Sequence, residues 1–398
     1  MKIIPSERTK NIRYAIRDIG VEAKNLEKAG KKIICLNIGD PLKYDFKTPK
    51  HLISAIESTW SKSSSYADSM GIDSAREAVS REAARIGIKG VTPEDTIITA
   101  GGSEGIIMSI SALINSGDNI LTPVPGYPLY NSTVMQFEGK MNEYRLNEED
   151  EWQPDLADMI KKINSRTKAI VIINPNNPTG SVYTRSTLKR IIDIAGEHNL
   201  PIFTDETYDK LILDDDFSFT SVGSISGDVP VVTFNTLSKN YLVPGWRAGW
   251  AIFSGPRESI GDYADAVKKI ARARLCTNSP VQYAIQPALE GPQDHLKDVI
   301  RKLKARRDIT YKRINEIEGL SVKKPHGAFY AFPRIDVDVE SDEVFVRKLL
   351  QEEGVVLVHG SGFGRLDEKY FRVVFAASEQ ALNDAFDKLE NFVKKNYM

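Results

Sequence analysis

The segment from Thr236 to Arg247 places two cationic side chains close together in an unusual setting. Lys239 follows an apolar run and stands beside the hydroxyl groups of Thr236 and Ser238, and Arg247 comes eight residues later, behind a Pro-Gly break. An anion between the cations would explain their proximity, since a guanidinium group and hydroxyl donors together bind phosphate. Taken alone, Lys239 would be an ordinary surface lysine, so the interpretation depends on the rest of the chain.

Three other segments place polar groups directly after apolar, strand-like runs. Asp205 closes one such run, Asn177 follows another in NPNNPTG, and Gly101-Gly102 follows a third and opens a helix. In open α/β sheets ligands bind beyond the carboxyl ends of the strands, so these groups are expected to meet. Each also has an ordinary explanation: Asp205 as a helix cap, and Asn177 and the glycine pair as turns. The joint pattern is what favours a ligand site.

The elements that would position these groups alternate between strands and helices over the first two thirds of the chain. This alternation predicts an α/β fold whose large domain has a mostly parallel, seven-stranded sheet sandwiched by helices. After Pro256 the sequence pattern changes to that of long charged helices and short strands, which predicts a smaller α+β domain. We expect an N-terminal segment, residues 1–46, that packs with the small domain, a large domain of residues 47–290 and a small C-terminal domain of residues 291–398. The seven predicted strands are 96–99, 119–122, 140–145, 169–173, 202–204, 231–234 and 248–253.

Composition excludes several classes of function for this chain of 398 residues. A formal net charge of -1 gives no footprint for nucleic acid, and no apolar run approaches the roughly 18–20 residues of a membrane-spanning helix. The first residues show no signal peptide, and two cysteines suggest no disulfide framework, so a cytoplasmic location is expected. Five scattered histidines lack metal-ligand spacing, and we predict no metal site.

One cofactor explains a lysine, a phosphate site and a buried aspartate together: pyridoxal 5'-phosphate. Its aldehyde condenses with a lysine amine, and its protonated ring withdraws electrons. A carboxylate such as Asp205 keeps the ring nitrogen protonated. Asn177 and Tyr208 can contact the ring oxygen, and Tyr127 can lie against the ring face, although Tyr127 could equally be a core residue.

The motifs NPNNPTG, DETYD and TLSKNYLVPGWRAGW resemble the signature segments of fold-type I, class I/II aminotransferases. LNIGDPLKYDF, TAGGSEG, KPHGAFYAFPRI and VLVHGSGFG are more narrowly similar to the prokaryotic alanine aminotransferase branch. The resemblance implies that Lys239 forms the Schiff base, that Asp205 pairs with the ring nitrogen, that Asn177 and Tyr208 contact the ring oxygen and that Tyr127 stacks on the ring. It implies a phosphate site in which backbone N–H groups of Gly102, Ser103 and Glu104 donate to the phosphate and the side chains of Thr236, Ser238 and Arg247 complete the site.

The same resemblance extends to the substrate and to the assembly. Arg372 would hold the substrate α-carboxylate with help from Gly39 and Asn177, as a bidentate arginine–carboxylate pair requires. Tyr14 and Arg17 match positions that line the substrate pocket, although on pattern alone they could lie on a solvated helix face. Tyr66 would reach the phosphate bound by a neighbouring subunit, which implies a homodimer with shared sites.

We therefore predict a reversible aminotransferase, acting on L-alanine and 2-oxoglutarate to give pyruvate and L-glutamate. Within the same fold, an aromatic, aspartate or kynurenine aminotransferase or a β-lyase would use the same Lys239 apparatus. A non-catalytic, effector-binding regulator is a remote alternative, because no basic helix-turn-helix segment precedes residue 30. A nucleotide-linked oxidoreductase is disfavoured by the missing dinucleotide fingerprint.

Overall fold

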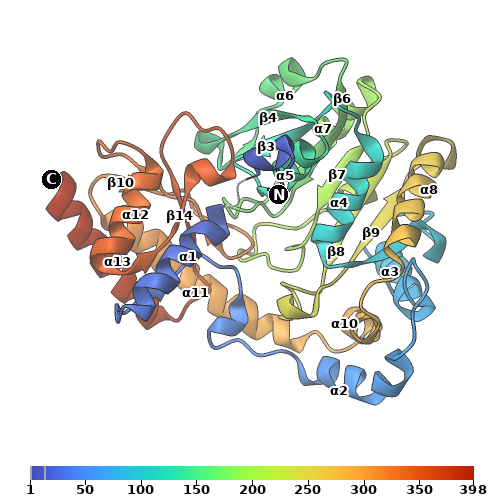
Figure 1. Cartoon of the computed structure of the whole chain (residues 1–398), viewed down its shortest axis with the longest axis horizontal. Helices are drawn as coiled ribbons and strands as arrows, with labels where there is room; N and C mark the ends of the chain where they lie inside the picture. The colour runs from blue at the N-terminus through green and yellow to red at the C-terminus, as the bar shows by residue number, and fades with distance from the viewer. Residues whose placement is uncertain (1, 13–14) are drawn as a thin grey trace.

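The computed structural model describes residues 2–12 and 15–398, and it has two parts that lie side by side in Figure 1. One part, coloured cyan through yellow, is built around a large sheet with helices on both sides. The other combines the dark-blue helix α1 (Ala15–Lys28) with the orange and red C-terminal segment, whereas the dark-blue turn η1 (Glu7–Asn11) packs on α5 (Leu129–Gln136) of the first part. Tyr14, predicted to line the substrate pocket, lies outside the described residues.

The large sheet has eight strands, and β9 runs antiparallel to both of its neighbours while β8, β7, β6, β3 and β4 are mutually parallel. The mostly parallel α/β sheet predicted from the sequence is thereby confirmed. Across the sheet the strands follow the order β2 (Thr96–Ala100), β9 (Ala248–Ser254), β8 (Val231–Thr236), β7 (Ile202–Asp205), β6 (Thr167–Ile173), β3 (Asn119–Val124), β4 (Lys140–Asn147) and β5 (Gln153–Pro154).

All seven predicted strands are present, but the count of seven is one short because the structure adds β5 at the sheet edge. This strand has two residues and pairs antiparallel with β4. A strand of two residues is too short to show the alternation of apolar and polar residues by which a strand is predicted from sequence. Pro154 is tolerated there because an edge strand does not need every N–H for pairing.

Helices cover both faces of the sheet, and the side chains of β6 show how. Ile170 and Ile172 are buried in the cluster that contains Leu188 of α7, whereas Val171 and Ile173 are buried in the cluster that contains Ile106 of α4. Successive strand residues thus point to opposite faces, and a strand covered on both faces is apolar throughout. The helices between residues 47 and 290 are α2 (Lys50–Thr59), α3 (Asp73–Arg85), α4 (Gly102–Leu113), α5 (Leu129–Gln136), α6 (Leu156–Lys162), α7 (Arg185–Glu197), α8 (Arg257–Arg274), α9 (Ser279–Gln282) and α10 (Ile285–Glu290).

The smaller part joins the two ends of the chain through strand pairing. β1 pairs in parallel with β13, placing Ile34 opposite Val355, and α1 packs on α12. Its remaining strands form a two-stranded sheet, β10 with β12, and a three-stranded sheet in the order β11-β15-β14. The elements are α1 (Ala15–Lys28), β1 (Ile34–Cys35), α11 (Asp294–Glu316), β10 (Leu320–Ser321), β11 (Tyr330–Ala331), β12 (Arg334–Ile335), α12 (Asp342–Glu353), β13 (Val355–Val356), β14 (Val358–His359), β15 (Phe371–Val374) and α13 (Glu379–Tyr397).

Short 3-10 turns connect these elements, and two of them, η2 and η7, flank the site described below. The turns are η1 (Glu7–Asn11), η2 (Pro41–Lys43), η3 (Trp60–Ser63), η4 (Pro93–Asp95), η5 (Glu148–Asp150), η6 (Val222–Ser224), η7 (Pro244–Trp246) and η8 (Gly360–Phe363). Within residues 2–12 and 15–398, no helix combines the length and the apolar composition that crossing a membrane requires.

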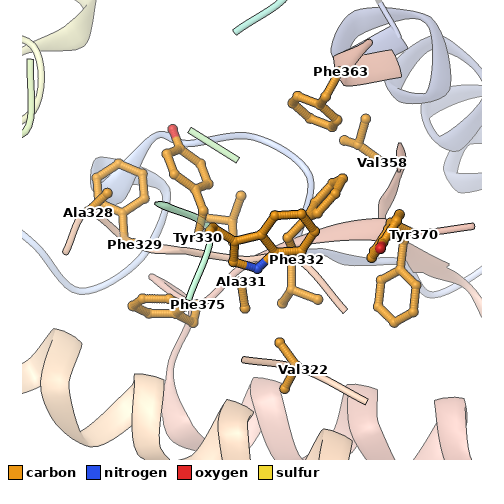
Figure 2. Close-up of a cluster of buried hydrophobic side chains, with 14 of the residues drawn as sticks. Val322, Ala328, Phe329, Tyr330, Ala331, Phe332, Val358, Phe363, Tyr370 and Phe375 are labelled. Atoms are coloured by element: carbon orange, nitrogen blue, oxygen red, sulfur yellow. The ribbon is translucent and has the colours of Figure 1, made fainter. Parts of the chain in front are cut away.

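An aromatic cluster ties the two parts together, and Figure 2 shows its members from the smaller part. The rings of Phe332 and Tyr370 stack with centroids 5.0 Å apart, and Phe363 meets Phe332 edge-on at 5.8 Å. Trp152, beside β5 in the large sheet, contacts Phe332 and Tyr370 edge-on at 5.8 and 5.5 Å. Such pairs favour a fixed geometry, and Tyr330 adds a second ring contact between the two parts by meeting Tyr208 edge-on at 5.6 Å.

Candidate active site

A cavity of about 600 Å³ lies where the two parts meet, at the carboxyl ends of β6, β7 and β8. This is the edge at which open α/β sheets bind ligands. The sequence-predicted residues that line it are Arg17, Gly39, Gly102, Ser103, Tyr127, Asn177, Asp205, Tyr208, Thr236, Ser238, Lys239, Arg247 and Arg372.

Lys239 lies in the turn after β8, and its side chain is directed into the cavity. Its Nζ donates a hydrogen bond to the carbonyl oxygen of Gly39, over 2.6 Å. Burial lowers the pKa of Lys239 to about 8; the charge of Asp40 opposes this shift, and Arg372, Arg247 and, to a lesser extent, Arg17 reinforce it. At pH 7.4 about a fifth of this amine is therefore neutral, far more than for an ordinary lysine, and the neutral form is the one that acts as a nucleophile or a general base.

Asp205 ends β7 and is buried at the cavity wall. Burial raises the pKa of its carboxyl group, against hydrogen bonds from Thr207 and Tyr130. The backbone N–H of Thr207 donates to Asp205 Oδ1 over 3.2 Å within a turn, and no helix begins there, so Asp205 is not a helix cap. No cation within residues 2–12 and 15–398 forms an ion pair with Asp205, and a buried carboxylate of this kind stabilises a positively charged ligand atom placed beside it.

Donors suited to an anion gather at the opposite end of the cavity, around the N-terminus of α4. Gly101 has φ +73°, and a Cβ there would lie 2.5 Å from Nη2 of Arg247, so only glycine lets the chain and the guanidinium pack this closely. Arg247 donates to Ser238 Oγ over 3.4 Å, and the Oγ atoms of Ser238 and Thr236 are 2.9 Å apart. A helix N-terminus with a guanidinium and two hydroxyl groups forms a phosphate site.

Arg372 on β15 is 1% exposed and approaches the cavity from the smaller part. Its Nη1 donates to Asn177 Oδ1 over 2.9 Å, and its Nη2 donates to the carbonyl oxygen of Asn37 over 2.6 Å. The guanidinium also lies over the rings of Tyr330 and Phe363, at 4.6 and 4.8 Å from their centroids. These contacts fix its plane, which favours bidentate binding of a carboxylate.

Two tyrosines that line the cavity, one from each part of the molecule, share a hydrogen bond. The hydroxyl groups of Tyr208 and Tyr330 are 2.6 Å apart, and burial raises the pKa of both phenols. Both hydroxyls are therefore protonated, so one can donate to the other while the second proton is free for a ligand oxygen. A Cβ on Gly39 would lie 2.3 Å from the Tyr330 hydroxyl, which requires glycine at that position.

Comparison with known proteins decides the family. The family model described as "Aminotransferase class I and II" matches residues 31–389. The chain belongs to the class I and II aminotransferases. It is 40% identical to a Haemophilus influenzae protein named glutamate-pyruvate aminotransferase AlaA, covering 99% of each chain, and 39% identical to the alanine aminotransferase of Mycobacterium tuberculosis, covering 98% of this chain and 92% of that one.

A solved structure agrees with this assignment. The alanine aminotransferase from Pyrococcus furiosus superposes with a TM-score of 0.95 at 44% identity, covering 99% of this chain and all of the other. Class I and II aminotransferases depend on pyridoxal phosphate, so this chain is a pyridoxal-phosphate-dependent transaminase.

The cavity fits this cofactor in its donor set. The Lys239 amine, whose pKa is lowered, suits the aldehyde of the cofactor, and the buried Asp205 carboxyl group suits its ring nitrogen. The anion site suits its phosphate. The glycine at 101 leaves the space beside Arg247 that an added Cβ would fill.

Two predicted site residues do not line the cavity. The side chain of Glu104 accepts a hydrogen bond from the backbone N–H of Ala100 over 2.7 Å and lies 3.6 Å from Arg274. The role predicted for Glu104 uses its backbone N–H, which lies 3.3 Å from the carbonyl oxygen of Gly101, and that role stays a prediction. Tyr66 is 80% exposed, as a residue serving a neighbouring subunit would be, and that role stays a prediction.

The cavity also contains residues that the sequence reasoning did not single out, chiefly Asp40, Lys43 and Tyr330. Asp40 and Tyr330 lie in NIGDP and GAFYAF, two segments that already carried the family resemblance. Lys43 lies in LNIGDPLKYDF, which also carried the resemblance, but as an exposed lysine on a three-residue turn it has no pattern of its own that marks it as a site residue.

Proposed function

We propose that the protein transfers the amino group between L-alanine and 2-oxoglutarate, giving pyruvate and L-glutamate, in either direction. The observation that carries this proposal is the arrangement in one cavity of Lys239, the buried Arg372 and the exposed Arg17. A reactive amine, an anchor for an α-carboxylate and a further cation are what a monocarboxylate and a dicarboxylate amino acid need in turn. The names of the relatives from Haemophilus influenzae and Mycobacterium tuberculosis support the same pair of substrates.

In this proposal the cofactor is held at its phosphate, its ring nitrogen, its ring oxygen and its ring face by groups already described. Gly102 and Ser103 of α4, with Arg247 and the Thr236 and Ser238 hydroxyls, would hold the phosphate. Asp205 would hold the proton on the ring nitrogen, and Asn177 and Tyr208 would donate to the ring oxygen. Tyr127 would lie on the ring face. Bound pyridoxal phosphate supplies an aldehyde that exchanges amines and a ring that accepts the electron pair of a broken Cα–H bond.

The chain's own residues orient the amino acid and move its proton. Arg372 binds the α-carboxylate, with its guanidinium plane kept in place by Asn177, Asn37 and the Tyr330 ring. Lys239 Nζ takes the Cα proton as a general base and returns a proton as a general acid. Its lowered pKa suits both steps, because an amine near pKa 8 is populated in both forms near neutral pH. Arg17 is proposed to bind the distal carboxylate of the five-carbon substrates.

We further propose a homodimer whose sites are completed by Tyr66 of the neighbouring subunit. Trp60 is 64% exposed and borders an apolar hollow of about 430 Å³ lined also by Ile53, Ile56 and Trp246. Exposed apolar surface of this kind supports association. A cytoplasmic location and the division into residues 1–46, 47–290 and 291–398 belong to the same proposal.

The test is an assay of the purified protein with L-alanine and 2-oxoglutarate, detecting pyruvate and glutamate separately. We expect both products in equal amounts, and an absorption band at about 400–430 nm that disappears on addition of L-alanine. Sedimentation should show twice the chain mass. Faster transfer from aromatic amino acids, aspartate or kynurenine, or release of pyruvate and ammonia by β-elimination, would favour another member of the fold over an alanine aminotransferase.

A further inference from the structure

Seven charged side chains line the cavity, and one of its cations, Lys43, has no role in the proposed function. The carboxylates are Asp40 and Asp205, and the cations are Arg17, Lys43, Lys239, Arg247 and Arg372. In the proposed function Lys239 binds the aldehyde of the cofactor, Arg247 binds its phosphate, and Arg372 binds the α-carboxylate of the substrate. Arg17 was expected at the distal carboxylate, but Lys43 has been given no role.

Arg17 and Lys43 differ from the other three cations in their bonding. Lys239, Arg247 and Arg372 each donate hydrogen bonds to protein oxygens. Neither Arg17 nor Lys43 makes a side-chain hydrogen bond or an ion pair with any of the residues that the structure describes. Both are exposed at the cavity mouth, one on α1 and the other on η2. Their charges are free to bind a ligand.

The turn that carries Lys43 is fixed in relation to the reactive amine. The Asp40 carboxylate caps η2 by accepting from the backbone N–H of Leu42 over 3.1 Å. The preceding residue, Gly39, accepts the hydrogen bond from Lys239 Nζ. Lys43 thus follows, within four residues, a backbone group in direct contact with the catalytic amine.

The charges at the mouth match one additional carboxylate. Arg17 and Lys43 bring two positive charges, and Asp40 brings one negative charge to the same wall. One positive charge therefore remains once the cofactor and the α-carboxylate have taken their partners. L-Alanine and pyruvate have no second carboxylate to pair with this remaining positive charge, whereas L-glutamate and 2-oxoglutarate each have one.

We infer that Lys43 is a specificity-determining residue that binds, together with Arg17, the second carboxylate of five-carbon dicarboxylate substrates. The inference rests on the proposed function and adds a residue that sequence reasoning did not find. The negative charge of Asp40 weakens the electrostatic attraction that Arg17 and Lys43 exert on a dianionic substrate.

The experiment compares Lys43→Gln and Asp40→Asn in the cofactor-loaded enzyme. The readouts are the KM for 2-oxoglutarate, the KM for pyruvate and calorimetric binding of two unreactive acids, glutarate and butyrate. Glutarate has the two carboxylates of the five-carbon substrate, and butyrate has only one. Lys47→Gln is the matched control, because Lys47 is exposed on the same segment and does not line the cavity.

For Lys43→Gln we expect the KM for 2-oxoglutarate and the Kd for glutarate to rise roughly tenfold, the size of effect expected for a charge-assisted hydrogen bond. The values for pyruvate and butyrate should change far less. Asp40→Asn should change the glutarate Kd in the opposite direction, by about two- to threefold, because asparagine still caps the turn while the negative charge is gone.

Two results would overturn the inference: an unchanged glutarate Kd in Lys43→Gln, or an equal loss for glutarate and butyrate, which would indicate a merely structural role. Failure of the proposed function looks different. In that case the unmodified enzyme would not convert 2-oxoglutarate, while glutarate binding would still report on Lys43.

Discussion

The two ends of the cavity are built on different principles. At the cofactor end, Asp205, Ser238 and Thr236 are 4–7% exposed and stand at the ends of sheet strands, bonded to protein groups. At the mouth, Arg17 and Lys43 are exposed on a helix and a short turn of the N-terminal segment. The cofactor end is organised before anything binds, whereas the mouth holds charges that water can solvate.

This difference reflects what each end must do. A cofactor is the same in every turnover, so buried dipoles fixed by the sheet serve it without reorganisation. The mouth has to accept a methyl group in one half of the reaction and a carboxylate in the other. An exposed cation is well solvated when alanine is bound, and it gains a partner when glutamate enters, so it serves both at little cost.

The most severe way to test the cofactor end is Lys239→Ala. Activity should fall by about 10⁴-fold or more, because both the covalent attachment of the cofactor and the general base are removed. Steady-state rates and the 400–430 nm band measure the two losses separately. Lys62→Ala, an exposed lysine outside the cavity, is the control and should behave as the unmodified protein. Retention of more than about 1% of the activity in Lys239→Ala would contradict the assigned role.

Replacing the buried anchor should affect every substrate. For Arg372→Lys we expect kcat/KM to fall by about 10²- to 10³-fold for L-alanine and L-glutamate alike, because lysine cannot form the bidentate pair or keep the contacts to Asn177 and Asn37. Arg334→Lys is the control, since Arg334 pairs with Asp336 outside the cavity. A loss confined to one of the two amino acids would show that Arg372 binds something other than the common α-carboxylate.

A change at the mouth should separate the substrates. Arg17→Gln is expected to raise the KM for 2-oxoglutarate roughly tenfold while that for pyruvate rises far less, because only the dicarboxylate loses a charged partner. Lys24→Gln, on the exposed side of the same helix, controls for a general effect of lost positive charge. An unchanged KM for 2-oxoglutarate would remove Arg17 from the distal-carboxylate site.

The smallest expected effect links the two ends through the pKa of Lys239. Attack on an aldehyde requires the neutral amine, so uptake of pyridoxal phosphate by the cofactor-free protein should accelerate as pH rises through about 8 and then level off. Asp40 raises this pKa. Asp40→Asn should therefore move the midpoint to lower pH and increase the uptake rate at pH 7 by about two- to threefold. Stopped-flow absorbance across pH 6–10 measures it, and a midpoint displaced upward would contradict the assigned interaction.

The cofactor end of the cavity could be predicted from the sequence because the ends of the parallel strands converge. Lys239, Asp205 and Asn177 each follow an apolar run, and the parallel sheet brings those ends to one edge. Arg372 was found through the family resemblance, and its burial within β15 agrees with the apolar residues on either side of it in the sequence.

The residues at the mouth were harder to predict from the sequence because their positions depend on packing between distant segments of the chain. Lys43 belongs to a three-residue turn, and its neighbourhood shows neither helical nor strand periodicity. Its approach to the cavity follows from the pairing of β1 with β13 and from the contact between Gly39 and the Tyr330 hydroxyl. β5 escaped prediction for a related reason, since Trp152 beside it is buried against rings of the distant smaller part.

The pairing of β1 with β13 also has a consequence for the order in which the protein is made. Cys35 is synthesised 321 residues before its partner Val356. The large sheet, whose strands lie between residues 96 and 254, can assemble first because all its strands are already available. The N-terminal segment must wait, and closing so long a loop is slow. A newly made chain would thus complete its cofactor end before it acquires the mouth that selects substrates.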